Sequence, residues 1–268
     1  MEVKQVKLGV IGAGNMGSAI IRGYIAGGAE PQSVTVCGHH PDKLNKLSQE
    51  LGITLVDSPS ELTKACDVIL LAVKPKDVAE VLSSADQAFT PEKILVSIAA
   101  GKTIDILSSY CPSARKIIRV MPNTPARVGS GMSVLSRNKE VTDEDYRVVE
   151  SVFNGIGLAE EVPESLMDAV TGLSGSGPAF VYLFIEALAD GGVLCGLPRE
   201  KAISLAAQTV YGSARMVLET QTHPASLKDA VCSPGGTTIE GVRKLEAGAF
   251  RSTVIEAVAA ACEKSKRL

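Results

Sequence analysis

Three absences narrow the functions open to this chain of 268 residues. It has no long basic run and its formal net charge is −3, so it lacks the positive surface that binds nucleic-acid phosphates. No apolar stretch approaches the length of a membrane span. The segment Met1–Lys7 shows no apolar region with a small-residue cleavage site. These absences predict a cytoplasmic protein that binds neither nucleic acid nor membrane.

Closely spaced cysteines are also missing. The six cysteines form no CxxC pair and no His/Cys cluster with metal-ligand spacing; they are Cys37, Cys66, Cys111, Cys195, Cys232 and Cys262. We expect reduced, mostly buried thiols and no metal site. Cys232 borders a glycine-rich loop. We interpret it as a small apolar side chain that fills space, in preference to a nucleophile.

A glycine motif stands near the start of the sequence. A short apolar strand, Lys7–Ile11, is followed by Gly12-Ala-Gly-Asn-Met-Gly17 and then by a helical stretch over 18–25. In this context Gly12 permits a tight turn, Gly14 lets a pyrophosphate approach the backbone, and Gly17 lets the helix pack on the strand. The motif predicts a dinucleotide-binding site, and a purely structural glycine-rich turn is the alternative.

The end of the next predicted strand, Val34–Cys37, bears on the choice of dinucleotide. An NAD-binding fold places an acidic residue there, on the ribose 2′-hydroxyl. This chain has Gly38 followed by His39, His40 and Lys43, which suits a 2′-phosphate better. The pattern favours NADPH over NADH; two solvated loop histidines are the other interpretation, and Asp42 can act as a helix cap.

Strands and helices continue to alternate up to residue 163, which predicts an α/β Rossmann domain, 1–163, with a doubly wound, mostly parallel sheet. The further strands are expected at 67–73, 93–98, 116–121, 131–136 and 157–162, with helices at 60–65 and 143–153 and another opened by Lys74-Pro75. Ligands in such sheets bind beyond the carboxyl ends of the strands. Lys74 at this rim either faces the cofactor or marks a solvated strand end.

After residue 163 the strand patterns vanish and an all-α domain, 164–268, is expected. Helices are predicted at 163–173, 178–191, 198–219, 224–231, 238–247 and 251–266. The stretch 179–185 and much of 203–218 are apolar on every face, so they must be buried. A domain of this size has too little interior for both, which predicts a homodimer at least.

The most suggestive stretch of the second half is Cys232-Ser-Pro-Gly-Gly-Thr-Thr-Ile-Glu240. Gly235 and Gly236 allow a sharp turn with a close backbone approach, and Thr237 or Thr238 is expected to cap the next helix. A helix N-terminus fronted by glycine amides suits a small anion such as a carboxylate. An ordinary Gly-Gly turn with a cap is the alternative.

Five motifs together resemble the pyrroline-5-carboxylate reductase family over essentially the whole chain: residues 12–17, 72–75, 121–125, 171–179 and 227–238. The resemblance implies NAD(P)H-dependent reduction of the cyclic imine 1-pyrroline-5-carboxylate to L-proline, the last step of proline biosynthesis. It also implies a Rossmann domain joined to a helical dimerisation and substrate domain, with dimers that often assemble into decamers.

The resemblance implies roles for individual residues as well. Thr238 would donate a proton to the ring nitrogen, and the substrate carboxylate would be held by Ser233, Gly235, Gly236 and Thr237. The cofactor would be bound by Ile11, Gly12, Ala13, Gly14, Asn15, Met16, Gly17, His39, His40, Ala72, Val73, Lys74, Pro75, Ile98, Ala99 and Ala100. An iminium carbon is already a strong electrophile, so this chemistry needs no strong acid, and only His223 is available as a histidine in the helical half.

One departure and two alternatives remain open. The family usually carries Ser or Arg near positions 39 and 40, so the His pair leaves the cofactor preference open and makes it sensitive to pH. A 3-hydroxyacid dehydrogenase of similar layout would need Lys201 or Lys228 as its acid. A dinucleotide sensor without catalysis would have no need of the loop 232–238.

Overall fold

The computed structural model describes residues 6–268, and the expectation for the extreme N-terminal segment falls partly outside them. The chain forms two compact units. One runs up to Gly175 and also contains Ala261–Leu268, and the other is Ser176–Ala260. The unit boundary therefore lies beyond residue 163, and the last turns of the chain return to the first unit; the domain division at 163/164 stays a prediction.

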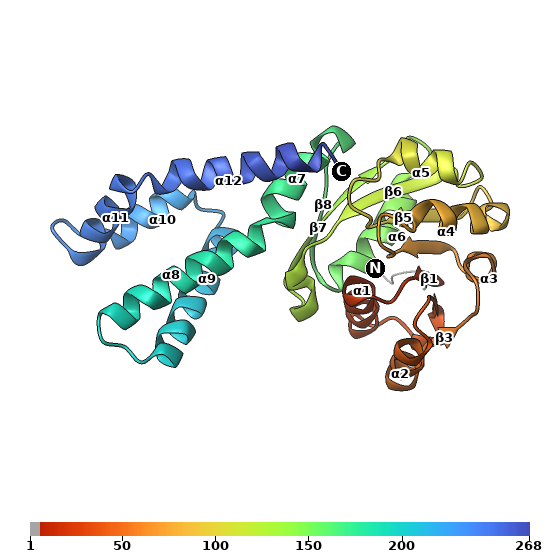
Figure 1. Ribbon diagram of the computed structural model, residues 1–268, viewed down its shortest axis with the longest axis horizontal. Coiled ribbons are helices and arrows are strands. Elements are labelled where there is room, and N and C mark those ends of the chain that lie inside the picture. Colours follow the sequence, from red (N-terminus) through yellow and green to blue (C-terminus); the bar gives the residue numbers. More distant parts are fainter. Residues whose placement is uncertain (1–5) are drawn as a thin grey trace. The chain divides into compact units, whose positions relative to one another are not determined.

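The first unit is built on one sheet (Figure 1). Within residues 6–268, eight strands lie in the order β3-β2-β1-β4-β5-β6-β7-β8. Their bounds are β1 Leu8–Ile11, β2 Val34–Cys37, β3 Thr54–Leu55, β4 Val68–Leu71, β5 Ile94–Ser97, β6 Lys116–Met121, β7 Gly131–Arg137 and β8 Gly157–Glu161. Only β6 and β7 pair antiparallel; the other pairs are parallel. The doubly wound Rossmann fold predicted from the sequence is confirmed.

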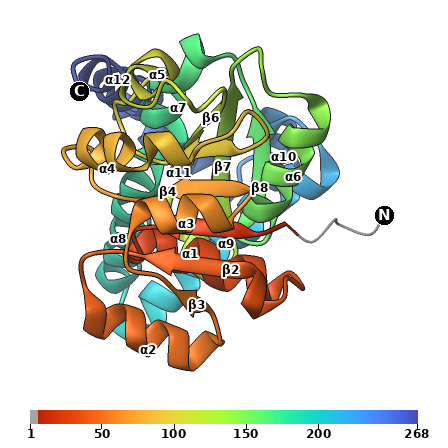
Figure 2. The ribbon, with the colours of Figure 1, turned by 90° about the vertical axis from the view of Figure 1, so that its right-hand side faces the viewer.

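Helices cover both faces of this sheet and create two separate cores. On one face α1 Asn15–Ala26, α2 Pro41–Leu51 and α6 Asp143–Asn154 bury side chains such as Ile21, Leu44 and Phe153. On the other face lie α3 Pro59–Ala65, α4 Val78–Ala85 and α5 Ile104–Tyr110 (Figure 2). Leu62 and Leu82 are buried in the core on this side. Strands β1, β2, β4 and β5 are buried at every position, as expected for strands packed on both sides.

Three local expectations were wrong or incomplete. Pro75 does not open a helix: the Asp77 amide donates to the Lys74 carbonyl at 2.9 Å and closes a turn, so α4 begins only at Val78. The two-residue strand β3 and the seven-residue helix α5 were not predicted. Such short elements carry too little periodicity to stand out in the sequence.

The second half of the chain is helical, as predicted. The elements are 3₁₀ turn Glu164–Leu166, α7 Met167–Val170, π-helix Thr171–Gly175, α8 Gly177–Leu194, α9 Arg199–Thr220, α10 Pro224–Val231, α11 Thr237–Ala247 and α12 Phe250–Ser265. The break predicted between 173 and 178 is shorter than expected: the π-helix ends at Gly175, Ser176 is a bend, and α8 begins at Gly177. Pro178 is accommodated directly after the π-helix, whose wider turn changes the hydrogen-bond pattern there.

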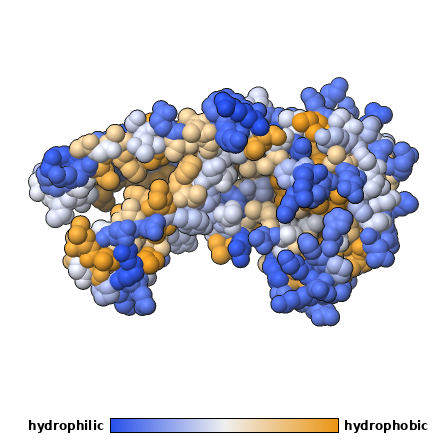
Figure 3. All heavy atoms as spheres, in the orientation of Figure 1, coloured by the Kyte–Doolittle hydropathy of each residue, from blue (hydrophilic) through white to orange (hydrophobic). Residues whose placement is uncertain are grey.

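The helical unit buries little of its own apolar surface. Its core contains only three buried residues within the described chain: Ala189, Ala202 and Ala206. Large side chains of α8 and α9 remain exposed, among them Tyr182, Leu183 and Leu205. Figure 3 shows hydrophobic surface on this part of the molecule. The helix Glu164–Leu194 is also long and apolar enough to cross a membrane, with mean hydropathy 1.3 over its best window. This corrects the expectation that no stretch approaches that length.

Candidate active site

The glycine motif of the first unit lies at the carboxyl end of β1. Gly12 adopts φ +97°, and its amide donates to the Cys37 carbonyl at 2.9 Å, which ties the loop to β2. A Cβ on Gly17 would lie 2.3 Å from the Gly12 carbonyl oxygen, so only glycine lets α1 pack this closely. Around Gly14, in contrast, a Cβ would meet nothing within 4 Å. Two glycines therefore build the loop, and Gly14 leaves it open for a ligand.

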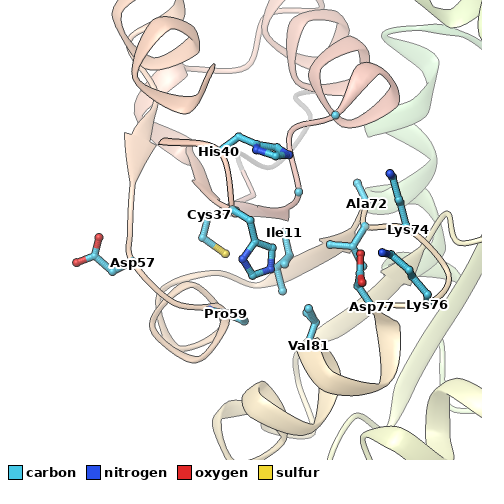
Figure 4. A pocket seen from close by; sticks show the side chains of 15 residues that line it. Ile11, Cys37, His40, Asp57, Pro59, Ala72, Lys74, Lys76, Asp77 and Val81 are labelled. Carbon is cyan, nitrogen blue, oxygen red and sulfur yellow. The ribbon is translucent and has the colours of Figure 1, made fainter. Parts of the chain in front are cut away.

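This loop borders a cleft of about 370 Å³ formed by the carboxyl ends of β1, β2 and β4. Its lining comprises Ile11, Gly12, Gly14, Cys37, Gly38, His39, His40, Asp57, Pro59, Ala72, Val73, Lys74, Lys76, Asp77 and Val81 (Figure 4). Gly14 is the N-cap of α1 and, being glycine, has no side chain that could cap the helix. The first amides of α1 therefore have no acceptor within the helix and can donate to an anion.

The charged side chains of the cleft come from two places. Lys74 and Lys76 belong to the turn that follows β4, so Lys74 does face this cleft. Asp77 lies in the same turn, while Asp57 points away from the other labelled side chains (Figure 4). His39 and His40 are exposed at the end of β2, and His40 is the N-cap of α2. Asp42 is therefore in the first turn of α2 and is not its cap.

Not every residue expected to bind the cofactor reaches this cleft. Ala13 and Asn15 line a neighbouring hollow between α1 and α2, while Met16 and Ile98 pack against the core. Ala99 is only 4% exposed and its side chain belongs to the opposite core, so it offers backbone atoms only. Gly17 is buried under the loop, and Pro75 and Ala100 do not line the cleft.

The cleft also contains residues that sequence reasoning missed: Asp57, Pro59, Lys76, Asp77 and Val81. Lys76 and Asp77 had a detectable signal, because they continue the rim segment that begins at Ala72. Pro59 and Val81 had none, since each lies at the start or within the first turns of a helix whose orientation only the fold determines.

The loop in the helical unit forms a tight turn between α10 and α11. The Gly236 amide donates to the Ser233 carbonyl at 3.0 Å, with Pro234 and Gly235 as the two central residues. Gly235 adopts φ +67°, which favours glycine. A Cβ on Gly236 would lie 2.3 Å from Ser233 Oγ. The sequence Ser-Pro-Gly-Gly is thus explained by the turn itself, and the hydroxyl of Ser233 lies directly over Gly236.

The threonines of this loop have a different position from the one predicted. Gly236 is the N-cap of α11, and Thr237 and Thr238 are its first two helical residues, so neither caps the helix. The reason is that the chain already turns at Gly235 and enters the helix one residue early. Since glycine supplies no capping oxygen, the first amides of α11 are without a side-chain acceptor. Both threonine side chains are exposed beside them.

Other reactive groups are engaged elsewhere. His223 Nδ1 accepts a hydrogen bond from the Ala225 amide at 3.2 Å and caps α10. Burial raises the pKa of the Cys37 thiol to about 12, so it stays protonated near neutrality. Cys232 is half-buried at the end of α10. Residues 6–268 contain no group of three His, Cys, Asp or Glu side chains placed to hold a metal ion.

Comparison with known proteins identifies the family. Residues 164–268 match the family model for pyrroline-5-carboxylate reductase dimerisation, and residues 7–101 match NADP oxidoreductase, coenzyme F420-dependent. The pyrroline-5-carboxylate reductase of Escherichia coli is 49% identical over 263 residues, 98% of each chain. The chain belongs to the pyrroline-5-carboxylate reductase family.

Plant and structural relatives agree with this membership. The pyrroline-5-carboxylate reductase of Arabidopsis thaliana is 46% identical, over 98% of this chain and 95% of its own. The solved structure of the Coxiella burnetii pyrroline-5-carboxylate reductase superposes with a TM-score of 0.95 at 34% identity, covering 98% of each chain. The Plasmodium falciparum pyrroline carboxylate reductase, solved with NADP bound, has a TM-score of 0.86 at 40% identity, over 99% of this chain and 98% of that one.

The residues of this family member fit a dinucleotide phosphate group. Gly14 leaves space where a side chain would otherwise stand, and the uncapped start of α1 presents amides to it. No acidic residue ends β2, since Gly38, His39 and His40 follow Cys37. Lys74 and Lys76 border the same cleft beside Asp77, and Asp57 points away from the other labelled side chains (Figure 4). The donor set is therefore complementary to anionic phosphates.

Proposed function

We propose that this protein reduces 1-pyrroline-5-carboxylate to L-proline, with NADPH as the hydride donor and NADH as the alternative donor. The observation that carries the proposal is the tight turn Ser233–Gly236 ahead of an uncapped α11, in a chain that matches pyrroline-5-carboxylate reductases from end to end. When bound, the reduced nicotinamide supplies the hydride that adds to the imine carbon.

The loop supplies two functions to this reaction. The amides at the start of α11 and the Ser233 hydroxyl are suited to hold the substrate carboxylate. The Gly236 amide already donates to the Ser233 carbonyl. Gly235 and Gly236 therefore contribute to carboxylate binding by having no side chains, which leaves room for the substrate. Thr237 belongs to the same first turn, and the Thr238 hydroxyl donates to the ring nitrogen. Each amide-to-carboxylate bond is worth about 1.5–3 kcal/mol.

The chemistry places modest demands on the protein. An iminium carbon accepts hydride readily, so orientation and exclusion of water are the main contributions expected of the chain. His223 is committed to capping α10, and Lys228 is paired with Asp229 at 2.7 Å. Neither is needed as an acid, because the Thr238 hydroxyl is the proton donor to the ring nitrogen in this proposal. Ile11–Gly17, His39, His40, Ala72–Pro75 and Ile98–Ala100 bind the cofactor in this proposal, the buried Ala99 through its backbone.

The same proposal includes assembly and location. The protein forms at least a homodimer and assembles further into decamers in the cytoplasm. A second copy covers the exposed apolar side chains of α8 and α9, including Leu183, which is 68% exposed. A helix that is apolar on all faces must be covered by protein or by lipid. A second subunit accounts for the apolar character of Glu164–Leu194 without a membrane.

The deciding experiment is the oxidation of NADPH by the purified protein with 1-pyrroline-5-carboxylate, run in parallel with NADH. Rapid oxidation with proline as the product is expected, and faster turnover with NADPH supports a 2′-phosphate site at His39 and His40. A protein that binds NADPH but oxidises neither cofactor would refute the reductase and favour a dinucleotide sensor.

A further inference from the structure

The loop between β5 and α5, residues 98–103, is held by segments far away in the sequence. Its own hydrogen bonds are local: the Ile98 amide donates to the Leu71 carbonyl at 3.2 Å, the Ala99 amide to Ser97 Oγ at 3.3 Å, and Thr103 caps α5 by accepting from the Ile106 amide at 3.2 Å. Two further anchors come from residues after 163, and both belong to the first compact unit.

The first anchor is Glu164. Its Oε1 accepts a hydrogen bond from the Ile104 amide at 2.8 Å, at the point where the loop enters α5. The same oxygen lies 3.3 Å from a guanidinium nitrogen of Arg119, a buried side chain on β6. A charge that binds a helix-terminal amide and a buried arginine together fixes the end of the loop against the sheet.

The second anchor is the last turn of the chain described here. Ser265 is 5% exposed, and its hydroxyl donates to Asp168 Oδ1 at 2.6 Å. The Ser265 carbonyl in turn accepts the Leu268 amide at 3.1 Å. This closes a turn whose backbone lies against the loop: a Cβ on Gly101 would be 2.9 Å from Leu268 Cβ and 3.0 Å from its carbonyl carbon.

We propose that Glu164 and the Asp168–Ser265 pair are positioning residues for cofactor binding. Glu164 holds the end of the β5–α5 loop at Ile104, and the Asp168–Ser265 pair holds the last turn of the chain against Gly101. The inference rests on the proposed function, in which Ile98–Ala100 bind the cofactor, Ala99 through its backbone, from beyond the residues that line the cleft. None of the three side chains touches the cofactor cleft. They act by keeping the loop in its binding-competent conformation, and apparent affinity falls in proportion to the fraction of molecules that leave that conformation.

The test compares wild-type protein with Ser265→Ala in two measurements, NADPH binding and hydrogen exchange of the peptide covering 98–104. We expect faster exchange in this peptide and a rise in the NADPH dissociation constant of about threefold to tenfold. At saturating NADPH, kcat should stay near the wild-type value while KM for NADPH rises. Ser265→Thr keeps the hydroxyl and should restore both. Ser109→Ala, whose hydroxyl binds only within α5, is the matched control.

A second pair of variants tests the contact at Gly101. Gly101→Ala and Gly129→Ala impose the same backbone strain, since the two glycines have φ +71° and +70°. Only the methyl at 101 meets another segment, because Gly129 has nothing within 4 Å. We expect Gly101→Ala to accelerate exchange in 261–268 as well as in 98–104, and Gly129→Ala to do neither.

Wild-type exchange and wild-type NADPH affinity in Ser265→Ala would overturn the proposal. So would a loss spread evenly over all peptides, which indicates general destabilisation. Failure of the proposed function is distinguishable: the wild-type protein would then not turn over 1-pyrroline-5-carboxylate, while the exchange of 98–104 in the free protein would still report on the two anchors.

Discussion

The glycine loop permits a sharp prediction, because two of its glycines serve opposite purposes. A methyl on Gly14 would enter open space, whereas a methyl on Gly17 would lie 2.3 Å from the Gly12 carbonyl oxygen. We therefore expect Gly14→Ala to weaken cofactor binding and spare the fold. Gly17→Ala should destabilise the fold itself.

The magnitudes follow from local geometry. Gly14 has φ −71°, which alanine adopts without strain. Alanine is slightly worse than glycine as an N-cap, but it reduces the entropy of the unfolded chain, so the net change is within about 0.5 kcal/mol. For Gly17→Ala the ordinary carbon-to-oxygen separation is about 3.3 Å or more. Two backbone segments must move apart, at a cost of about 2 kcal/mol.

These values translate into melting temperature and affinity. At about 2–4 °C per kcal/mol, Gly14→Ala should leave Tm within about 2 °C, and Gly17→Ala should lower it by about 4–8 °C. A methyl where a pyrophosphate approaches the backbone costs about 1–3 kcal/mol of binding, a loss of NADPH affinity of about 5-fold to 150-fold.

The assay is thermal unfolding of the three proteins at one concentration, together with NADPH titration by fluorescence. A single concentration matters because subunit association makes Tm depend on it. Wild-type NADPH affinity in Gly14→Ala would contradict the assignment of this loop to the cofactor. If both variants unfolded at the same lowered temperature, the distinction between the two glycines would be wrong.

Four further predictions concern the other features. Thr238→Ala should lower kcat/KM for the imine by about 10²-fold, and Gly236→Val should raise the substrate KM while NADPH binding stays intact; unchanged kinetics in either case would contradict the assigned roles. Burial raises the pKa of Cys37 and Cys111 from 9.0 to about 12, so native protein at pH 8 should not react with thiol reagents at these positions. Because unfolding restores the lower value, these thiols stabilise the fold fully below pH 9, and this contribution is lost as the pH rises towards 12, which alkaline unfolding curves can check. Leu183→Asp should weaken self-association by about 10²-fold or more, measured by light scattering, because it buries an unpaired charge in the subunit contact.

The sequence determined the architecture because local patterns dictate it. Strands such as Val34–Cys37 and Lys116–Met121 are apolar runs bounded by turn residues, and the structure reproduces both ranges. The helices after residue 163 begin at or near Pro178, Pro198 and Pro224, whose fixed φ suits a first turn. The glycine motif likewise pointed to the cleft that Gly12 and Gly14 line, since its spacing encodes a tight turn at the end of β1.

Tertiary structure decided everything that depends on contacts distant in sequence. Ala99 and Lys76 both lie in segments that follow a strand, yet the Ala99 side chain enters a core and Lys76 lines the cleft. The sequence predicts a threonine as the N-cap of α11, but the N-cap is Gly236, because the turn at Gly235 ends one residue earlier than expected. The hydrogen bonds from Ser265 to Asp168 and from the Ile104 amide to Glu164 join residues 97 and 60 positions apart. No periodicity encodes such pairs, since they exist only once the sheet and its helices have brought separate segments together.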